Sequence, residues 1–148
     1  MRRMVMIDVS EKPDVYREAV ATGRIRLRKE TIRKILNNEI EKGNVIETAR
    51  IAGILAAKKT SDLIPLTHPI PLTHVSLEFN FGEDYVEVRS KVSSVYKTGV
   101  EIEALVSVAT ALITIWDMIK KYEKDPTGNY PETLIEFIKV EQKIKRDI

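Results

Sequence analysis

The residue types best suited to acid–base chemistry and ligand binding gather in two stretches of this sequence. The first, Lys58–His74, contains both histidines of the chain and three of its six prolines. Prolines at this density exclude a helix or a central strand. We therefore expect a rigid, extended, apolar segment that packs against the core and holds its few polar side chains in fixed directions.

The two histidines of this stretch have different expected roles. His68 lies between Thr67 and Pro69, which restricts its backbone. A histidine on a rigid loop suits proton transfer or a hydrogen bond to a ligand, and a structural histidine bonded to a backbone carbonyl is an equal alternative. His74 is expected to open a strand. Two histidines six residues apart, with no further ligand, are a poor metal signal.

The second stretch, Glu101–Lys120, carries acidic residues on a predicted helix. Asp117 is the only ionisable residue between Ala104 and Ile119. A carboxylate buried in so apolar a helix is costly without a partner. A salt bridge to a following lysine at the exposed end of the helix is an equally good interpretation.

Glu101 and Glu103 stand at the start of the same helix. Glu101 follows Thr98 by three positions, so a capping role is favoured for it. Residues two positions apart on a helix point to nearly opposite sides. The pair is therefore not expected to act as a dyad.

Two lysine–glycine segments suggest a site for an anion. Lys42-Gly43 and Lys97-Thr98-Gly99 each come just before a predicted helix, where free backbone N–H groups attract negative charge. Arg17 and Arg50 are further cations available to such a site. Together they indicate a ligand that carries phosphate.

The composition excludes several classes of protein. The 148 residues suggest a single domain, residues 1–148. With 24 Lys and Arg against 22 Asp and Glu, the chain lacks the basic stripe typical of a nucleic-acid-binding surface. The absence of cysteine rules out disulfides, thiolate metal sites and a cysteine nucleophile. No signal peptide or membrane-spanning apolar run is visible, so a cytoplasmic protein without membrane contact is expected.

The apolar pattern predicts strands alternating with helices. The expected elements are a strand or ordered arm at Val5–Val9, a strand at Arg24–Arg28, helices at 29–37, about 44–58 and about 98–119, a hairpin of 75–81 and 85–95, a last strand or helix at 133–140, and a charged tail at 142–148. Capping boxes are expected at Asn44 with Glu47 and at Thr98 with Glu101.

This order predicts an α+β fold, an antiparallel sheet with helices packed on one face. From Ile102 to Ile119 the predicted helix is apolar on almost every face. This predicts that other parts of the structure pack against it on more than one side. In so short a chain, we expect another subunit to supply the second cover.

Two long blocks of the sequence resemble the cyclic pyranopterin monophosphate synthases, the C proteins of molybdenum cofactor (molybdopterin) biosynthesis. The blocks are GNVIETARIAGILAAKKTSDLIPLTHPIPLTHVSLEF, residues 43–79, and KTGVEIEALVSVATALITIWDMIKKYEKD, residues 97–125. The resemblance implies a ferredoxin-like α+β fold, assembled as a hexamer of three dimers with sites between subunits.

The resemblance also implies a lyase activity. Cyclic dihydro-GTP (3',8-cyclo-7,8-dihydroguanosine triphosphate), supplied by a radical S-adenosylmethionine enzyme, is converted to cyclic pyranopterin monophosphate with release of pyrophosphate. The rearrangement needs proton transfers and stabilised phosphate charge, and no cofactor of the protein's own, although Mg²⁺ can accompany the triphosphate. The alternative function is a non-catalytic oligomeric module that binds a nucleotide or pterin.

Residue by residue, the resemblance assigns catalysis to Asp117 and Lys120, which are expected to perturb each other's pKa as an acid–base pair. It assigns substrate binding to Leu66, Thr67, His68, Glu101, Ile102, Glu103, Lys42, Arg17 and Lys139, and no metal ligand. The family often has cysteine where this chain has Thr67. The family's glycine-rich C-terminal segment is absent here, and Lys139 is the candidate for its lysine.

Overall fold

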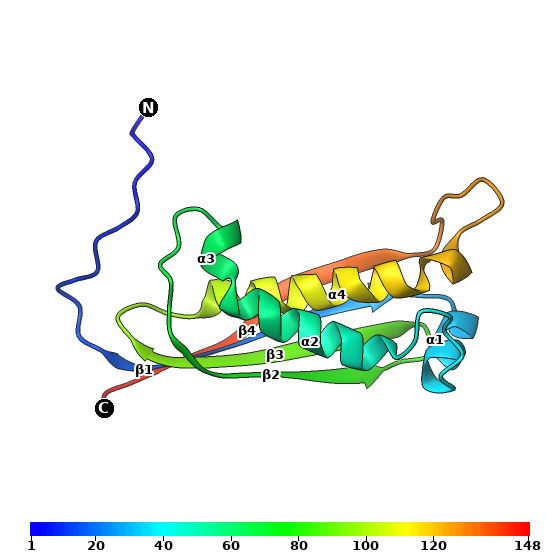
Figure 1. Ribbon diagram of the computed structural model, residues 1–148, viewed down its shortest axis with the longest axis horizontal. Coiled ribbons are helices and arrows are strands. Elements are labelled where there is room, and N and C mark those ends of the chain that lie inside the picture. The colour runs from blue at the N-terminus through cyan, green and yellow to red at the C-terminus, as the bar shows by residue number, and fades with distance from the viewer.

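A four-stranded antiparallel sheet forms the frame of the molecule, with its helices on one face (Figure 1). The computed structural model describes residues 1–148. Its elements are β1 (Val15–Arg26), α1 (Lys29–Leu36), α2 (Val45–Lys58), α3 (Thr60–Leu63), β2 (Leu72–Phe81), β3 (Tyr85–Tyr96), α4 (Glu101–Glu123) and β4 (Leu134–Arg146). The strand order is β2-β3-β1-β4. This βαββαβ arrangement confirms the predicted α+β, ferredoxin-like fold.

The sheet follows the predicted hairpin closely and extends beyond it. β2 and β3 pair antiparallel and are joined by a tight turn in which Gly82 N–H donates to the Tyr85 carbonyl at 2.9 Å. β1 is longer than the predicted strand Arg24–Arg28, because it already begins at Val15. Its first half, including Ala19 and Ala21, is buried between the neighbouring strands and the helices.

Helix α2 lies close to both the sheet and α4, as its small residues predicted. The Asn44 side chain accepts a hydrogen bond from Glu47 N–H at 3.0 Å, which confirms the predicted cap. A Cβ added at Gly53 would lie 2.5 Å from Leu77 Cδ2 on β2 and 3.1 Å from the Ser107 carbonyl on α4. Glycine at this position therefore allows the three elements to meet.

Helix α4 is the central core helix. Its inner face, including Val108, Leu112 and Ile115, is fully buried against the sheet. By length and composition α4 could cross a membrane, yet half of its apolar window is buried within this domain. On its outer face Ile113 is 60% exposed. The predicted cap at Thr98 is wrong, because α4 begins after Val100 without a side-chain cap.

At both ends of the chain the structure decides between predicted alternatives. Val5–Val9 is the arm and not the strand; it leaves the body of the molecule, and only Val9 is buried (Figure 1). The predicted last strand is confirmed, but residues 142–146 continue β4 and are not a separate tail. β4 lies at a sheet edge, where charged side chains face solvent and discourage uncontrolled strand pairing. That position explains a strand so rich in charge.

Candidate active site

A cavity of about 400 Å³ lies at the N-terminal end of α4 and contains both predicted substrate-binding segments. Leu66, Thr67 and His68 of the proline-rich loop form one side. The first turn of α4 forms another. The full lining is Val5, Ile7, Val9, Lys12, Leu66, Thr67, His68, Ile70, Thr98, Gly99, Glu101, Ile102 and Glu103. Segments more than thirty residues apart in sequence thus meet within one chain.

The proline-rich loop is fixed at its two ends and only partly packed on the core. The Thr67 hydroxyl donates to the Ile64 carbonyl at 2.8 Å, and the Ser94 hydroxyl donates to the Pro71 carbonyl at 2.6 Å. Ile70 packs on the core, but Leu66 and Ile64 are exposed. The prediction of one extended segment packed on the core is wrong, because Thr60–Leu63 forms helix α3 and the residues that follow it form a loop that is a pocket wall.

The first turn of α4 places Glu101 and Glu103 in the same cavity. The prediction of opposite sides is wrong, because Glu101 folds back over Gly99, where a Cβ would overlap its Oε1. That Oε1 is buried without a hydrogen-bond partner, while Oε2 accepts from Lys143 Nζ at 3.4 Å. The pocket therefore presents an unsatisfied acceptor to a ligand.

Glu103 is the buried carboxyl of the pocket, with only 3% of its surface exposed. Burial raises the pKa of the Glu103 carboxyl above its ordinary value, and the nearby charge of Glu101 raises it further. The pair thus combines an oxygen without a hydrogen-bond partner with a carboxyl biased toward its protonated form. Such a pair can exchange protons with a ligand.

His68 lines the cavity and is also bonded to the protein. Its Nε2 lies 2.6 Å from the carbonyl oxygen of Ile7 in the N-terminal arm. The structural interpretation of His68 is thus realised, although the ring still faces the pocket. His74 stands in β2 opposite Ser93, as predicted for a residue at the start of a strand. No group of three or more His, Asp or Glu side chains is arranged to hold a metal ion.

A second cluster lies at the C-terminal end of α4. Lys42 Nζ is 3.0 Å from Asp117 Oδ2, and Lys120 Nζ is 3.1 Å from Oδ1. Lys42 Nζ also donates to the Asp117 carbonyl at 3.2 Å. Asn44 caps α2, so the Lys42 side chain takes no part in this cap and contacts α4 instead. We call Lys42, Asp117 and Lys120 the lysine cluster.

Asp117 is exposed in the single chain, with 55% of its side chain accessible. Of the two interpretations of Asp117, the salt bridge to a following lysine at an exposed position is the one seen in the single chain, with Lys120 three positions on. Hydrogen bonds from Lys42 and then Lys120 lower the pKa of the Asp117 carboxyl below its ordinary value. A carboxylate held between two lysines can order them for an anion or exchange a proton with one of them.

Comparison with known proteins decides the family. The sequence model described as the MoaC family matches residues 6–145. The chain belongs to the MoaC family. A relative from Pyrococcus furiosus, named probable cyclic pyranopterin monophosphate synthase, is 59% identical over 142 residues, which cover 96% of this chain and 91% of the relative. Relatives of the same name from Saccharolobus solfataricus (57%, 95% of this chain, 94% of the relative) and Archaeoglobus fulgidus (56%, 95% and 90%) are also similar.

The remaining cations predicted for the site, Arg17 and Lys139 from the resemblance and Arg50 from the anion-site pattern, are spread over the chain. Arg17 is buried and donates to the carbonyls of Tyr96 at 3.4 Å and Lys97 at 3.1 Å. Arg50 likewise donates to the Leu77 carbonyl at 3.3 Å. Lys139 lies on β4, in neither the pocket nor the lysine cluster, with its Nζ 5.7 Å from the Phe137 ring centre. In one chain, only Lys42 of the predicted phosphate-binding cations reaches a cluster of predicted site residues.

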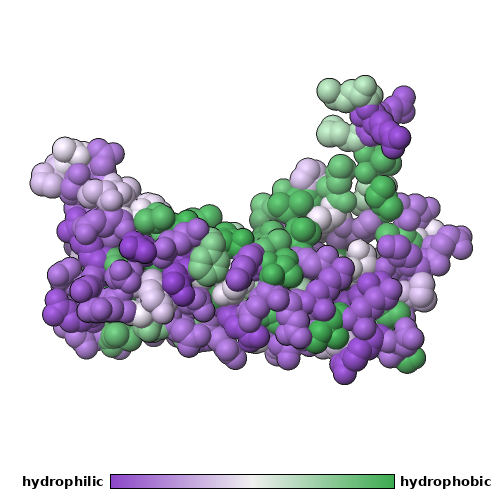
Figure 2. Space-filling model, turned by 180° about the vertical axis from the view of Figure 1, so that it is seen from behind, coloured by the Kyte–Doolittle hydropathy of each residue, from purple (hydrophilic) through white to green (hydrophobic).

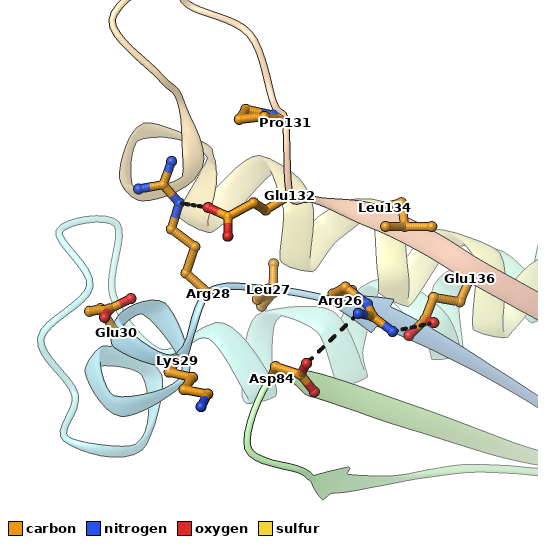
Figure 3. Close-up of a pocket in the computed structure, with 10 residues that line it drawn as sticks. All are labelled: Arg26, Leu27, Arg28, Lys29, Glu30, Asp84, Pro131, Glu132, Leu134 and Glu136. Carbon is orange, nitrogen blue, oxygen red and sulfur yellow. Dashed lines mark hydrogen bonds and ion pairs between the residues drawn. The ribbon is translucent and has the colours of Figure 1, made fainter.

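Another cavity, of about 820 Å³, lies elsewhere and contains no predicted site residue. Figure 3 shows that its charged side chains pair with one another across the ends of β1 and β4. Arg26 is 3.0 Å from Glu136, and Arg28 is 3.0 Å from Glu132. Because these charges already neutralise each other, the cavity shows no preference for an anion or a cation.

Two features escaped the sequence interpretation. Val5, Ile7, Val9 and Lys12 line the pocket, although no motif marked the N-terminal arm as part of the site. Glu123 is fully buried at the end of α4. The carboxylate of Glu123 accepts from Arg28 N–H, the Thr31 hydroxyl and the Thr133 hydroxyl at 3.0, 2.5 and 2.6 Å. The arm had a signal in its alternating apolar residues; Glu123 looked like an ordinary helix-end residue.

Proposed function

We propose that this chain is a cyclic pyranopterin monophosphate synthase. It converts cyclic dihydro-GTP to cyclic pyranopterin monophosphate and releases pyrophosphate, an early step of molybdenum cofactor biosynthesis. The observation that carries the proposal is the meeting of two segments in one pocket. Leu66–His68 and Glu101–Glu103, which the family resemblance assigns to substrate binding, line the same cavity.

The pocket end of α4 suits the ring system of the substrate. Apolar side chains such as Ile70 and Ile102 line part of the cavity. Glu101 offers an acceptor without a partner, and Glu103 offers a carboxyl biased toward protonation. Opening one ring and closing another requires protons to move at ring nitrogens, and these two carboxyls are the groups placed to move them.

The lysine cluster suits the triphosphate and the acid–base step assigned to Asp117 and Lys120. Lys42 and Lys120 flank the Asp117 carboxylate at 3.0 and 3.1 Å. Two ammonium groups held this close together can stabilise the charge that develops as pyrophosphate leaves. Arg17 and Lys139 have weaker support, because each lies outside both clusters.

The complete site takes residues from two copies of the chain. Glu103 and Asp117 are fourteen residues apart on one straight helix, a separation of about 21 Å at about 1.5 Å per residue. No lysine spans that distance, so the two clusters of one chain cannot serve one reacting centre. The pocket of one copy and the lysine cluster of another can.

Exposed apolar surface supports such an assembly. Ile51 and Leu55 on α2 and Ile113 on α4 are exposed large apolar residues on the helix layer. Figure 2 shows further apolar surface in the hollow between the N-terminal arm and the loop after α4. Surfaces of this kind are typical of subunit contacts. A homo-oligomer, arranged as three dimers in a hexamer, is the assembly we propose.

The wider setting follows from the chemistry of the substrate. A radical S-adenosylmethionine enzyme supplies the cyclic dihydro-GTP in the cytoplasm. The chain carries no cofactor of its own, and Mg²⁺ accompanies the triphosphate. No nucleic-acid or membrane partner is involved.

Incubating the purified protein with cyclic dihydro-GTP and measuring pyrophosphate and cyclic pyranopterin monophosphate tests the activity. Stoichiometric formation of both products with repeated turnover is expected. Tight binding of the substrate without pyrophosphate release would instead support a non-catalytic nucleotide- or pterin-binding module.

A further inference from the structure

The N-terminal arm is a wall of the pocket that belongs neither to a regular element nor to the proline-rich loop. Val5, Ile7 and Val9 all line the cavity, whereas the residues that alternate with them, Met4, Met6 and Asp8, do not. In an extended chain successive side chains point to opposite sides. One face of the arm is therefore directed at the pocket along its length.

The base of the arm is firmly attached to the body of the molecule. Val9 is buried, and Lys12 N–H donates to its carbonyl at 3.0 Å. Asp8 Oδ1 accepts from Ser10 N–H at 2.9 Å, which closes the turn that follows the arm. Lys97 Nζ donates to the Lys12 carbonyl at 3.2 Å and so ties this turn to the segment before α4.

Beyond that base the arm has one polar attachment, and it is to His68. The Ile7 carbonyl oxygen lies 2.6 Å from His68 Nε2. A carbonyl only accepts hydrogen bonds, so Nε2 carries a hydrogen. In the neutral ring Nδ1 is then the nitrogen that can accept a proton.

The apolar side chains of the arm are in an unusual position. Val5 and Ile7 are 64% and 66% exposed although they line a cavity. Apolar groups at the mouth of a pocket gain burial only when something fills the pocket. The planar ring of the substrate is such a group.

We propose that the arm, Val5–Lys12, is a substrate-positioning element of this site. Val5 and Ile7 close over the bound ring, and the Ile7 carbonyl holds His68 as a donor at Nε2 with Nδ1 free as its acceptor. Lys12 is the one lysine that lines this cavity. This inference rests on the proposed function, because it takes the substrate ring as the occupant of the pocket.

Paired serine substitutions test the apolar wall. The double variant Val5→Ser, Ile7→Ser alters the pocket face of the arm, and Met4→Ser, Met6→Ser alters the other face as the matched control. With cyclic dihydro-GTP, the first should raise KM about tenfold with kcat changed by less than about threefold, since apolar contact with the ring is lost. The control should stay within about twofold of wild type. Equal KM values for the two double variants would overturn the proposal that Val5 and Ile7 form an apolar wall against the ring.

Truncation tests the tautomer independently of activity. A chain in which the initiator methionine directly precedes Val9 lacks the carbonyl of position 7, whereas one that starts at Val5 keeps it. In ¹⁵N-labelled protein without substrate, wild type and the Val5 truncation should show His68 protonated at Nε2. The Val9 truncation should show a mixture of the two neutral forms. An unchanged ring signal in the Val9 truncation would overturn the role of the Ile7 carbonyl, even if the proposed activity were absent.

Discussion

The carboxylates near the two ends of α4 differ in burial and in their hydrogen-bond partners. At its N-terminal end Glu103 is buried and Glu101 has an oxygen without a partner, inside a cavity. At its C-terminal end Asp117 is exposed, and both of its oxygens contact lysines. A buried polar group that the protein leaves unsatisfied indicates a ligand. A satisfied surface carboxylate gives no such indication, so the lysine cluster gains a role only when another copy of the chain covers it.

Replacing Asp117 should have the largest effect on activity. We expect Asp117→Asn to lower kcat by about a thousandfold, because the carboxamide cannot exchange a proton at neutral pH. The thermal unfolding midpoint should hardly change, since this carboxylate is exposed and its ion pairs are at the surface. Steady-state pyrophosphate release and a thermal scan provide both measurements. Near wild-type turnover would reduce the lysine cluster to a surface ion pair.

Replacing the two carboxyls of the pocket should have the next largest effect. In the double variant Glu101→Gln, Glu103→Gln, we expect kcat/KM to fall by about a hundredfold, since Glu101 loses a charge-assisted contact with the ring and Glu103 loses the ability to exchange a proton. A variant that kept full kcat/KM would show that this cavity does not hold the substrate. The control is Glu78→Gln, an exposed carboxylate on β2 outside the cavity, which should behave as wild type.

The single variant Glu103→Gln should change how stability depends on pH. The pKa of Glu103 is raised in the folded protein, so the native state keeps this proton to a higher pH than the unfolded state does. Its contribution to stability is therefore lost as pH rises from the ordinary glutamate value through the raised one. The free energy of unfolding can be measured by chemical denaturation at steps of about one pH unit from about pH 4 to about pH 8. It should fall less with rising pH in Glu103→Gln than in wild type. Parallel curves would contradict a raised pKa for this buried carboxyl.

Neutralising Lys42 should have a moderate effect on activity. We expect Lys42→Met to raise KM or lower kcat by about tenfold to thirtyfold through lost contact with phosphate. Lys121→Met is the matched control, because Lys121 pairs with Glu41 on the adjoining surface and lies outside the cluster. Equal losses in the two variants would indicate a general effect of surface charge.

Glu123 should show the smallest effect on activity and a clear one on stability. Its carboxylate is buried like that of Glu103 but fully bonded. Glu123→Ala should lower the free energy of unfolding by about 3 kcal/mol, because two hydroxyls and a backbone N–H lose their acceptor. Denaturant unfolding measures this, and kcat of the folded variant should match wild type. If Glu123→Ala lost activity but not stability, a fully hydrogen-bonded buried carboxylate could no longer be separated in role from the carboxyls of the pocket.

Local patterns in the sequence predicted most of the fold. The alternation through Val86 and Val88 and the cap at Asn44 correspond to structure that depends on near neighbours. The long β1 and the charged second half of β4 were harder to predict, because their strand pairing joins segments over a hundred residues apart. Edge and centre positions of a sheet are not visible in a single segment.

The candidate site was predicted unevenly for a related reason. Helical periodicity separated Glu101 from Glu103, but it ignored the fold of Glu101 over Gly99. Apolar neighbours in sequence suggested a buried Asp117, whereas the outer face of α4 is open in one chain. Both errors come from side-chain direction and from the exposure of a helix face, which a linear pattern does not specify.

Mixing two inactive chains tests the central claim most directly, namely that the two ends of α4 act together across a subunit contact. The two chains are Asp117→Asn and the double variant Glu101→Gln, Glu103→Gln, dissociated and reassembled in equal amounts. Random pairing leaves about a quarter of the sites with an intact pocket and an intact lysine cluster, so the mixture should recover about a quarter of wild-type turnover. A mixture no more active than the mean of its two components would contradict the shared site.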